Sequence, residues 1–200
     1  MRKQPRQARS KAMVERIIEA GRRVLTEEGY DALTTNRVAV VAEVSPGSLY
    51  QYFPDKTSIL DEVIERYWDE VSERVTASLA DRIAPTDDGD DLAAARAITD
   101  ALLAALETDP NLLRVLSEEL PAARNRRRRA TLERRVRDLL STYLTLRPEI
   151  SSRPDPSLTA WVMVIALENL ALRWVLDAPG FDRDRLLDEI VALVGGYLAS

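Results

Sequence analysis

Apolar residues recur at every third or fourth position along most of this chain, and that spacing is typical of helices with one buried face. The pattern begins near Lys11 and returns in residues 55–75, 92–107, 121–146, 156–177 and 183–198. Prolines and glycines fall between these stretches, and no segment alternates as a half-buried strand does. The sequence therefore predicts an all-α fold of about nine helices.

Helix-start and helix-stop residues divide the N-terminal part into three helices. Gly29 suits a left-handed Schellman ending of the first helix. Thr34 or Thr35 can cap a short second helix, and Ser45-Pro46 provides a cap followed by proline at the first helical position. Two short helices joined by a tight turn, after a longer helix, predict a helix-turn-helix head. An acidic, turn-rich linker is expected at residues 84–91.

The composition excludes several classes of function. The chain contains no cysteine and no histidine, which removes the usual zinc sites and the Ser-His-Asp and Cys-His catalytic arrangements. We therefore expect no enzyme activity, no metal and no cofactor. We also read no apolar run of the roughly 18 to 20 residues that a membrane span needs, and no signal peptide. A cytoplasmic protein is therefore expected.

Charge is unevenly distributed along the chain. Residues 1–57 carry 10 Lys/Arg and 7 Asp/Glu, whereas the remainder carries 18 and 26. A basic N-terminal region joined to an acidic remainder favours the binding of a polyanion at one end of the molecule. The first ten residues, with four basic side chains, are predicted to be an unstructured arm that is either a frayed terminus or a DNA-contacting arm.

The segment that begins at Ser45 divides into two faces. Leu49 and Phe53, four residues apart, are the expected core anchors. Gly47 costs a helix about 1 kcal/mol relative to alanine, so its bare backbone is expected to allow close approach to DNA. Hydrogen-bonding side chains cluster around these residues: Ser45, Ser48, Tyr50, Gln51 and Tyr52.

The N-terminal region resembles the DNA-binding signature of the TetR family at residues 34–39, 44–53 and 55–56. The most specific part is the pattern Leu-Tyr-x-Tyr-Phe-x-x-Lys at 49–56. The resemblance covers roughly residues 10–60. It implies a DNA-binding domain at 1–57 and an effector-binding and dimerisation domain at 58–200. It also implies a transcriptional regulator that acts as a repressor. Such a protein binds an inverted-repeat operator as a homodimer and is released from it by a small, mainly apolar ligand.

The resemblance and the side-chain chemistry together assign the DNA contacts. Thr35, Tyr50 and Lys56 are expected to bind phosphates, and Gln51 to read a base through its amide. Core packing is the alternative for Tyr50 and for Tyr52. The full predicted DNA-binding set is Thr34, Thr35, Asn36, Arg37, Ser45, Pro46, Gly47, Ser48, Tyr50, Gln51, Tyr52 and Lys56.

Glu43 stands near a turn position that often carries glycine in this family. A left-handed backbone there would strain a non-glycine residue by about 1 kcal/mol, so we expect a slightly different turn. Arg37 is expected either to bind phosphate or to pair with Glu43.

The helix at 156–177 is apolar on nearly every side and must be covered on several. The family pairs its last two helices with those of a second copy, so residues 156–198 are expected to form a homodimer interface, with a monomeric core as the alternative. The remaining body is expected to enclose an effector pocket. The candidate lining is Tyr67, Trp68, Leu102, Leu106, Leu112, Leu116, Tyr143, Trp161, Ile165 and Glu168.

Glu168 is the polar residue of most interest in that set, because a buried carboxylate needs a partner. It is expected either to hold a cationic ligand or to pair with an arginine. Two other functions stay open at this stage. One is a DNA-binding regulator without a small-molecule effector, and the other is a helical ligand-carrier or interaction protein.

Overall fold

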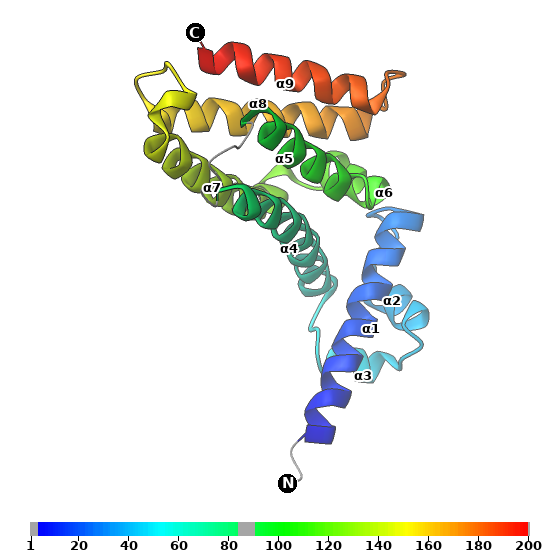
Figure 1. Ribbon diagram of the computed structural model, residues 1–200. Coiled ribbons are helices and arrows are strands. Elements are labelled where there is room, and N and C mark those ends of the chain that lie inside the picture. Colours follow the sequence, from blue (N-terminus) through cyan, green and yellow to red (C-terminus); the bar gives the residue numbers. More distant parts are fainter. Residues whose placement is uncertain (1–3, 84–90, 200) are drawn as a thin grey trace. The chain divides into compact units, whose positions relative to one another are not determined.

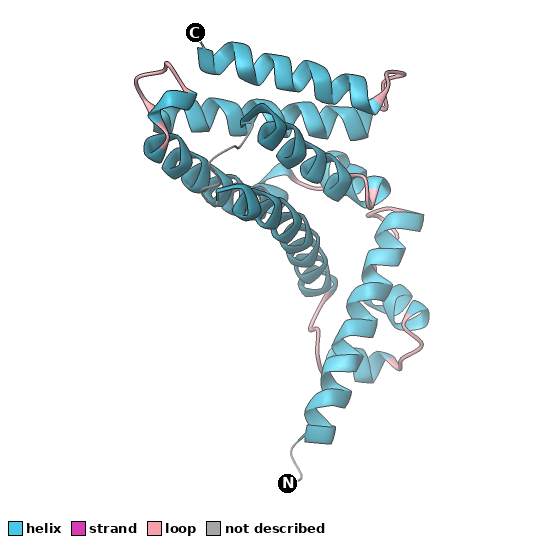
Figure 2. Cartoon of the chain, in the orientation of Figure 1, coloured by secondary structure: helices cyan, strands magenta, loops and turns pink. Residues whose placement is uncertain are grey.

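The computed structural model describes the backbone of residues 4–83 and 91–199, with their side chains except those of 4–8, 80–83, 122–125 and 127–128. In that part of the chain the regular structure is entirely helical (Figures 1 and 2). A π-helical turn follows α6 and a 3-10 turn follows α7. The nine α-helices of the described part are α1 (Gln4–Glu28), α2 (Thr35–Val41), α3 (Pro46–Tyr50), α4 (Lys56–Ile83), α5 (Asp91–Leu106), α6 (Pro110–Arg114), α7 (Ala122–Leu146), α8 (Pro156–Asp177) and α9 (Arg183–Ala199). The predicted all-α class is confirmed.

The start of the first helix differs from the prediction. Residues 4–10 belong to α1 and do not form an unstructured arm. This segment has no apolar face from which a helix could be recognised, but Gln, Ala and Arg are intrinsically good helix formers. Residues 1–3 of the predicted arm, and residues 84–90 of the predicted linker, lie outside the described residues.

The chain forms two compact units whose limits differ from the predicted boundary after residue 57. The first unit comprises residues 1–67 and 111–126, and the second comprises residues 68–110 and 127–200. Helix α4 begins at Lys56, next to the predicted boundary, and the first unit continues along it to residue 67. Residues 111–126 join the first unit through packing that is distant in sequence, which helical periodicity does not reveal.

A hydrogen bond from the end of α1 illustrates this distant packing. Gly29 has φ of 82°, as predicted for a helix ending, and its N–H donates to the Leu25 carbonyl at 3.1 Å. The next N–H, that of Tyr30, donates to the Glu119 carboxylate at 2.9 Å. The predicted Schellman ending is thus replaced by a single helix-closing bond, and a carboxylate of the π-helical turn accepts the other.

The turn between α2 and α3 corrects the prediction made for Glu43. Glu43 has φ of 54° and therefore adopts the left-handed conformation. Its N–H donates to the Val40 carbonyl at 3.1 Å, and the N–H of Val44 donates to the Ala39 carbonyl at 2.9 Å. These two bonds form a complete Schellman motif, which requires a left-handed residue at this position. The hydrogen bonds of the turn hold Glu43 in that conformation despite its side chain.

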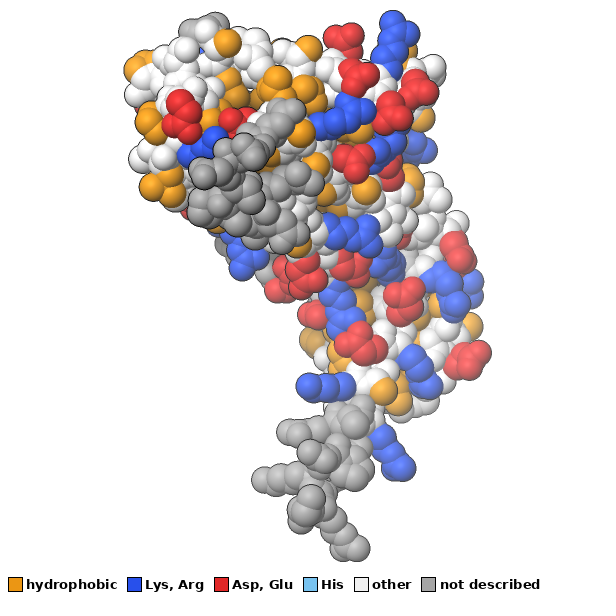
Figure 3. Space-filling model, viewed as in Figure 1, with side chains coloured by type: hydrophobic (Ala, Val, Ile, Leu, Met, Phe, Trp, Pro, Cys, Tyr) orange, Lys and Arg blue, Asp and Glu red, His pale blue; other side chains and the backbone are white. Residues whose placement is uncertain are grey.

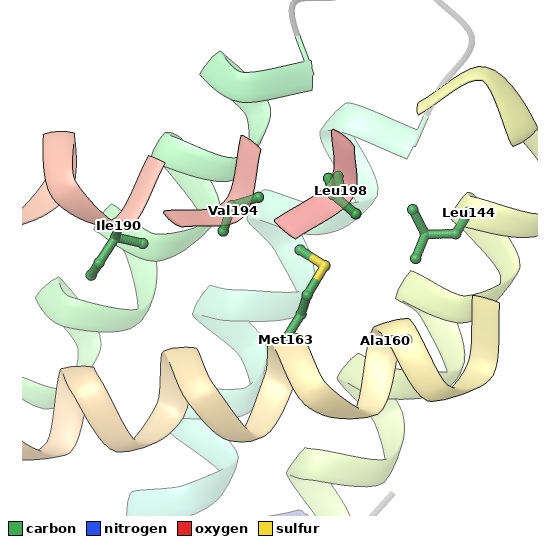
Figure 4. Packing of buried hydrophobic residues seen from close by; sticks show 6 residues of the cluster. All are labelled: Leu144, Ala160, Met163, Ile190, Val194 and Leu198. Carbon is green, nitrogen blue, oxygen red and sulfur yellow. The ribbon is translucent and has the colours of Figure 1, made fainter. Parts of the chain in front are cut away.

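The second unit is built around α5, α8 and α9. Helix α5 packs against both α8 and α9. Figure 4 shows Ile190, Val194 and Leu198, which recur at every fourth residue on one face of α9, with Met163 of α8 and Leu144 of α7 in the same apolar cluster. At the other end of α5, Glu107 accepts hydrogen bonds from the Trp174 indole at 3.0 Å and from Arg183 at 3.1 Å. An apolar cluster and a polar junction therefore hold these helices together.

One helix of the described part, α8, is long and apolar enough to cross a membrane when judged by length and composition alone. The expectation that no segment meets that criterion is therefore wrong. Core helices of water-soluble proteins pass the same test, and 44% of the most apolar stretch of α8 is buried within the chain.

We predict that Glu43→Gly stabilises the protein by up to about 1 kcal/mol, because glycine adopts the left-handed conformation without steric cost. Urea unfolding followed by circular dichroism measures the effect. Glu19→Gly is the matched control: Glu19 is exposed in the interior of α1, so glycine there should destabilise by about 1 kcal/mol. Equal destabilisation by both substitutions would contradict the strain at Glu43.

Candidate nucleic-acid interface and apolar cavity

Helices α2 and α3 are defined by side-chain caps that the sequence predicted. The Thr34 hydroxyl accepts from the N–H of Arg37 at 3.0 Å, so Thr34 is the cap of α2. The Ser45 hydroxyl accepts from the N–H of Ser48 at 3.1 Å, and Pro46 occupies the first helical position of α3. The predicted starts of both helices are confirmed.

The predicted division of the α3 segment into two faces is also present. Leu49 is fully buried and Phe53 is 7% exposed, so both anchor the segment in the first unit. Gln51 is exposed, and Tyr50 is 52% exposed. Core packing is therefore ruled out for Tyr50, whereas Tyr52 is half-buried. One face of the segment is free to contact another molecule.

Hydrogen bonds organise the polar residues of this face. The Thr35 and Tyr50 hydroxyls lie 3.0 Å apart and join α2 to α3. The Ser45 and Ser48 hydroxyls lie 2.8 Å apart. A Cβ placed on Gly47 would contact only the Ser45 hydroxyl, at 4.0 Å, so packing within the unit does not demand glycine there. The remaining exposed members of the predicted set are Thr34, Asn36, Arg37 and Pro46.

Arg37 pairs with a residue that the sequence analysis did not consider. Its guanidinium makes three hydrogen bonds of 2.7–3.0 Å to the Glu28 carboxylate. These bonds lower the pKa of Glu28. The predicted pairing with Glu43 is wrong: Glu43 follows α2 six residues after Arg37, on a different side of the helix, whereas the end of α1 packs beside α2 and brings Glu28 to Arg37. Arg37 thus joins α2 to α1.

Lys56 is positioned by an aromatic ring that sequence reasoning missed. Its ammonium group lies 5.0 Å from the centroid of the Tyr30 ring, which is within the range of a cation–π interaction. Tyr30 follows α1 and Lys56 begins α4, so no local pattern connects them.

Figure 3 shows acidic and basic side chains interspersed on the visible face. A basic excess in the sequence therefore does not appear there as a continuous one-signed surface.

The second unit contains an apolar cavity of about 120 Å³ between its helices. Apolar side chains from α4, α5, α7, α8 and α9 form most of its wall. Five of the ten predicted lining residues do line it: Trp68, Leu102, Leu106, Tyr143 and Glu168.

The other five predicted residues do not line this cavity. Tyr67, Leu112 and Leu116 are buried in the first unit. Trp161 is 48% exposed and Ile165 half-buried, because the cavity is lined by a different face of α8. Periodicity cannot identify that face in a helix that is apolar nearly all round. The lining residues of α8 are Met163, Val164, Leu167, Glu168 and Leu172.

Glu168 is 8% exposed, and its two carboxylate oxygens differ. Oε1 accepts a hydrogen bond from the Arg129 guanidinium, which confirms the arginine alternative for that oxygen. Oε2 is buried without a hydrogen-bond partner among the described residues. Burial raises the pKa of Glu168 to about 7, although Arg129 acts in the opposite direction. Glu133, which also lines the cavity, contributes to the rise.

A second polar group faces the cavity from Tyr143 and Asp91. The Tyr143 hydroxyl donates to the Asp91 carboxylate at 2.7 Å, and Arg147 lies 3.4 Å from the same carboxylate. Burial, followed by the bond to Asp91, raises the pKa of Tyr143 to about 12. Tyr143 therefore stays protonated and donates to Asp91 Oδ1, the oxygen that Arg147 also contacts.

Comparison with known proteins agrees with both parts of this description. Residues 17–63 match the family "Bacterial regulatory proteins, tetR family", and residues 92–198 match "Tetracyclin repressor-like, C-terminal domain". The HTH-type transcriptional regulator CymR of Pseudomonas putida is 30% identical over 178 residues, covering 85% of this chain and 84% of CymR. A TetR-family transcriptional regulator from Streptomyces coelicolor is 29% identical, with a TM-score of 0.61 over 93% of this chain and 97% of that one.

Nucleoid occlusion factor SlmA of Glaesserella parasuis is a further relative, 32% identical over 92 residues. The match covers 46% of this chain and 42% of SlmA, so the chain spans less than half the length of that relative. The helix-turn-helix unit and the accompanying helices have the fold of the TetR-type transcriptional regulators. This chain belongs to the TetR family.

We predict that the free energy of unfolding decreases between pH 5 and pH 8 because of Glu168. Its folded-state pKa is raised from about 4.5 to about 7, so the protonated form stabilises the fold at low pH. That stabilisation is lost as the pH rises through 7 and amounts to on the order of 2 kcal/mol. Urea unfolding at fixed protein concentration across this range measures it.

Glu168→Gln should remove most of this pH dependence, because glutamine stays neutral and can still accept from Arg129. Asp69→Asn, at an exposed position of α4, is the matched control and should leave the profile unchanged. An unaltered decrease in the Glu168→Gln variant would show that another group is responsible.

Proposed function

We propose that this chain is a transcriptional repressor that binds an inverted-repeat operator as a homodimer and is released by a small, mainly apolar ligand. The observation that carries the DNA-binding role is the α3 segment, whose anchors Leu49 and Phe53 are buried while Tyr50 and Gln51 are exposed. A recognition helix needs this division between packing and reading faces. The protein acts in the bacterial cytoplasm, on the nucleoid.

The exposed residues divide by chemistry into positioning and reading groups. Tyr50, joined to Thr35 by a hydroxyl pair, and Lys56, placed over Tyr30, bind phosphates and set the register on DNA. Gln51 carries an amide that can form two hydrogen bonds with adenine in the major groove. Pro46 and Ser48 lie close enough in sequence to touch neighbouring bases. Arg37 holds α2 in place through Glu28.

The dimer is formed by α8 and α9. Leu158 and Trp161, three residues apart on one face of α8, are 56% and 48% exposed, and Leu193 of α9 is 52% exposed. Large exposed apolar side chains on two neighbouring helices are typical of a surface that another chain covers. A second copy supplies matching helices and places two recognition helices on successive major grooves, about 34–36 Å apart.

The cavity of the second unit is the effector site of this proposal. A ligand that binds one conformation of the dimer more tightly shifts the population towards it. If the recognition helices are incorrectly spaced in that conformation, ligand binding lowers the affinity for the operator. Operator binding then lowers the affinity for the ligand by the same factor.

We predict that Gln51→Ala and Lys56→Ala have different effects on DNA binding. An operator is first selected from random duplex DNA with the full-length protein. Gln51→Ala should weaken the free energy of operator binding by about 1–3 kcal/mol and relax the sequence preference at one base pair in each half-site. Lys56→Ala should weaken binding to every sequence and flatten the dependence of log K on log salt by about one unit. Uniform losses from Gln51→Ala would refute its reading role.

We predict that Leu158→Asp converts the dimer to monomers, because it places a charge in the apolar interface. Multi-angle light scattering during gel filtration measures the mass. Leu146→Asp is the matched control, since Leu146 is 71% exposed at the end of α7, outside the proposed interface. A dimer that survives Leu158→Asp, or that dissociates equally in both variants, would contradict this interface.

A further inference from the structure

The charges that line the cavity are all acidic. Asp91, Glu133 and Glu168 line it, and none of the described lining residues is Lys or Arg. Asp91 pairs with the Tyr143 hydroxyl and with Arg147 through Oδ1, and 30% of its side chain is exposed to solvent. Glu168, with 10% of its side chain exposed, is the most buried of the three carboxylates.

One guanidinium serves both of those glutamates. The Arg129 Nε lies 3.3 Å from a Glu133 oxygen and also donates to Glu168 Oε1. When Glu168 is ionised, two carboxylates and one arginine leave one negative charge in excess. The excess is located at Glu168 Oε2, because this oxygen is buried and has no hydrogen-bond partner among the described residues.

An unpaired carboxylate oxygen in an apolar wall is costly, and a matching donor would relieve that cost. The raised pKa of Glu168 reflects the same cost, with burial as its main cause. A neutral ligand leaves the charge unpaired, and an anionic ligand adds repulsion. A cationic ligand supplies both the charge and the hydrogen bond, whereas the rest of the wall accepts only an apolar body.

We propose that the effector of this regulator is a small hydrophobic cation: an apolar ring or branched chain that bears one protonated nitrogen, which donates to Glu168 Oε2. This inference rests on the proposed role of the cavity as an effector site. The cavity volume of about 120 Å³ limits the body to about one aromatic ring, since a cavity of about 150 Å³ can hold benzene.

Three probes of nearly equal size separate the contribution of charge from that of the apolar ring: benzylamine, benzyl alcohol and benzoate. Their affinities for the full-length dimer are measured by isothermal titration calorimetry at pH 8, where Glu168 is mostly ionised. Benzylamine should bind about ten- to hundredfold more tightly than benzyl alcohol, as a charge-assisted hydrogen bond allows. Benzoate should bind most weakly.

Glu168→Gln should abolish the preference for benzylamine. The affinity for benzylamine should fall to that for benzyl alcohol, and the affinity for benzyl alcohol should not change. Glu133→Gln is a second variant that removes one carboxylate and leaves Arg129 to Glu168, so it should also reduce the preference. Asp69→Asn, exposed on α4, should keep it.

The outcomes distinguish this inference from the proposed function on which it rests. If benzyl alcohol binds as tightly as benzylamine, or if Glu168→Gln leaves benzylamine binding intact, the cation inference fails while an effector cavity survives. If none of the three probes binds, the ligand-controlled function itself is contradicted, and the inference with it.

Discussion

Helix α8 imposes the main constraint on the second unit, because a helix that is apolar on nearly every side must be covered on all of them. Its inner residues, such as Met163, pack with the face of α9 that carries Ile190 and Val194. Its outer residues Leu158 and Trp161 stay exposed in the single chain. The core, the cavity wall and the proposed dimer interface thus all use one helix, so a substitution in α8 affects whichever of these its side chain faces.

The first unit must hold the five-residue helix α3 in a fixed position so that its exposed side chains keep their orientation. Helix α3 is too short to be stable alone. It is held by the Ser45 cap, by the buried Leu49 and by the Schellman turn that places Glu43 in a left-handed conformation. The strain at Glu43 is a cost within the DNA-binding unit, and the hydrogen bonds of the turn offset it.

Glu168 shows how a polar group in a core can carry information about a ligand. The arginine that pairs with it is shared with Glu133, so the pairing is incomplete. A cavity wall that only needed to be stable would replace the buried carboxylate by an apolar side chain. The retained charge is destabilising in the folded chain, and this is the physical reason for proposing that the effector is a cation.

Sequence patterns determined most helices and the caps of α2 and α3, because the spacing of apolar residues and capping residues such as Thr34 and Ser45 act locally. They also determined the family and the two faces of the α3 segment. Only the tertiary structure decided which side of α8 lines the cavity, since that helix is apolar all round. The pairings of Arg37 with Glu28, Tyr30 with Glu119 and Arg129 with Glu168 likewise depend on contacts between distant segments, which local periodicity does not encode.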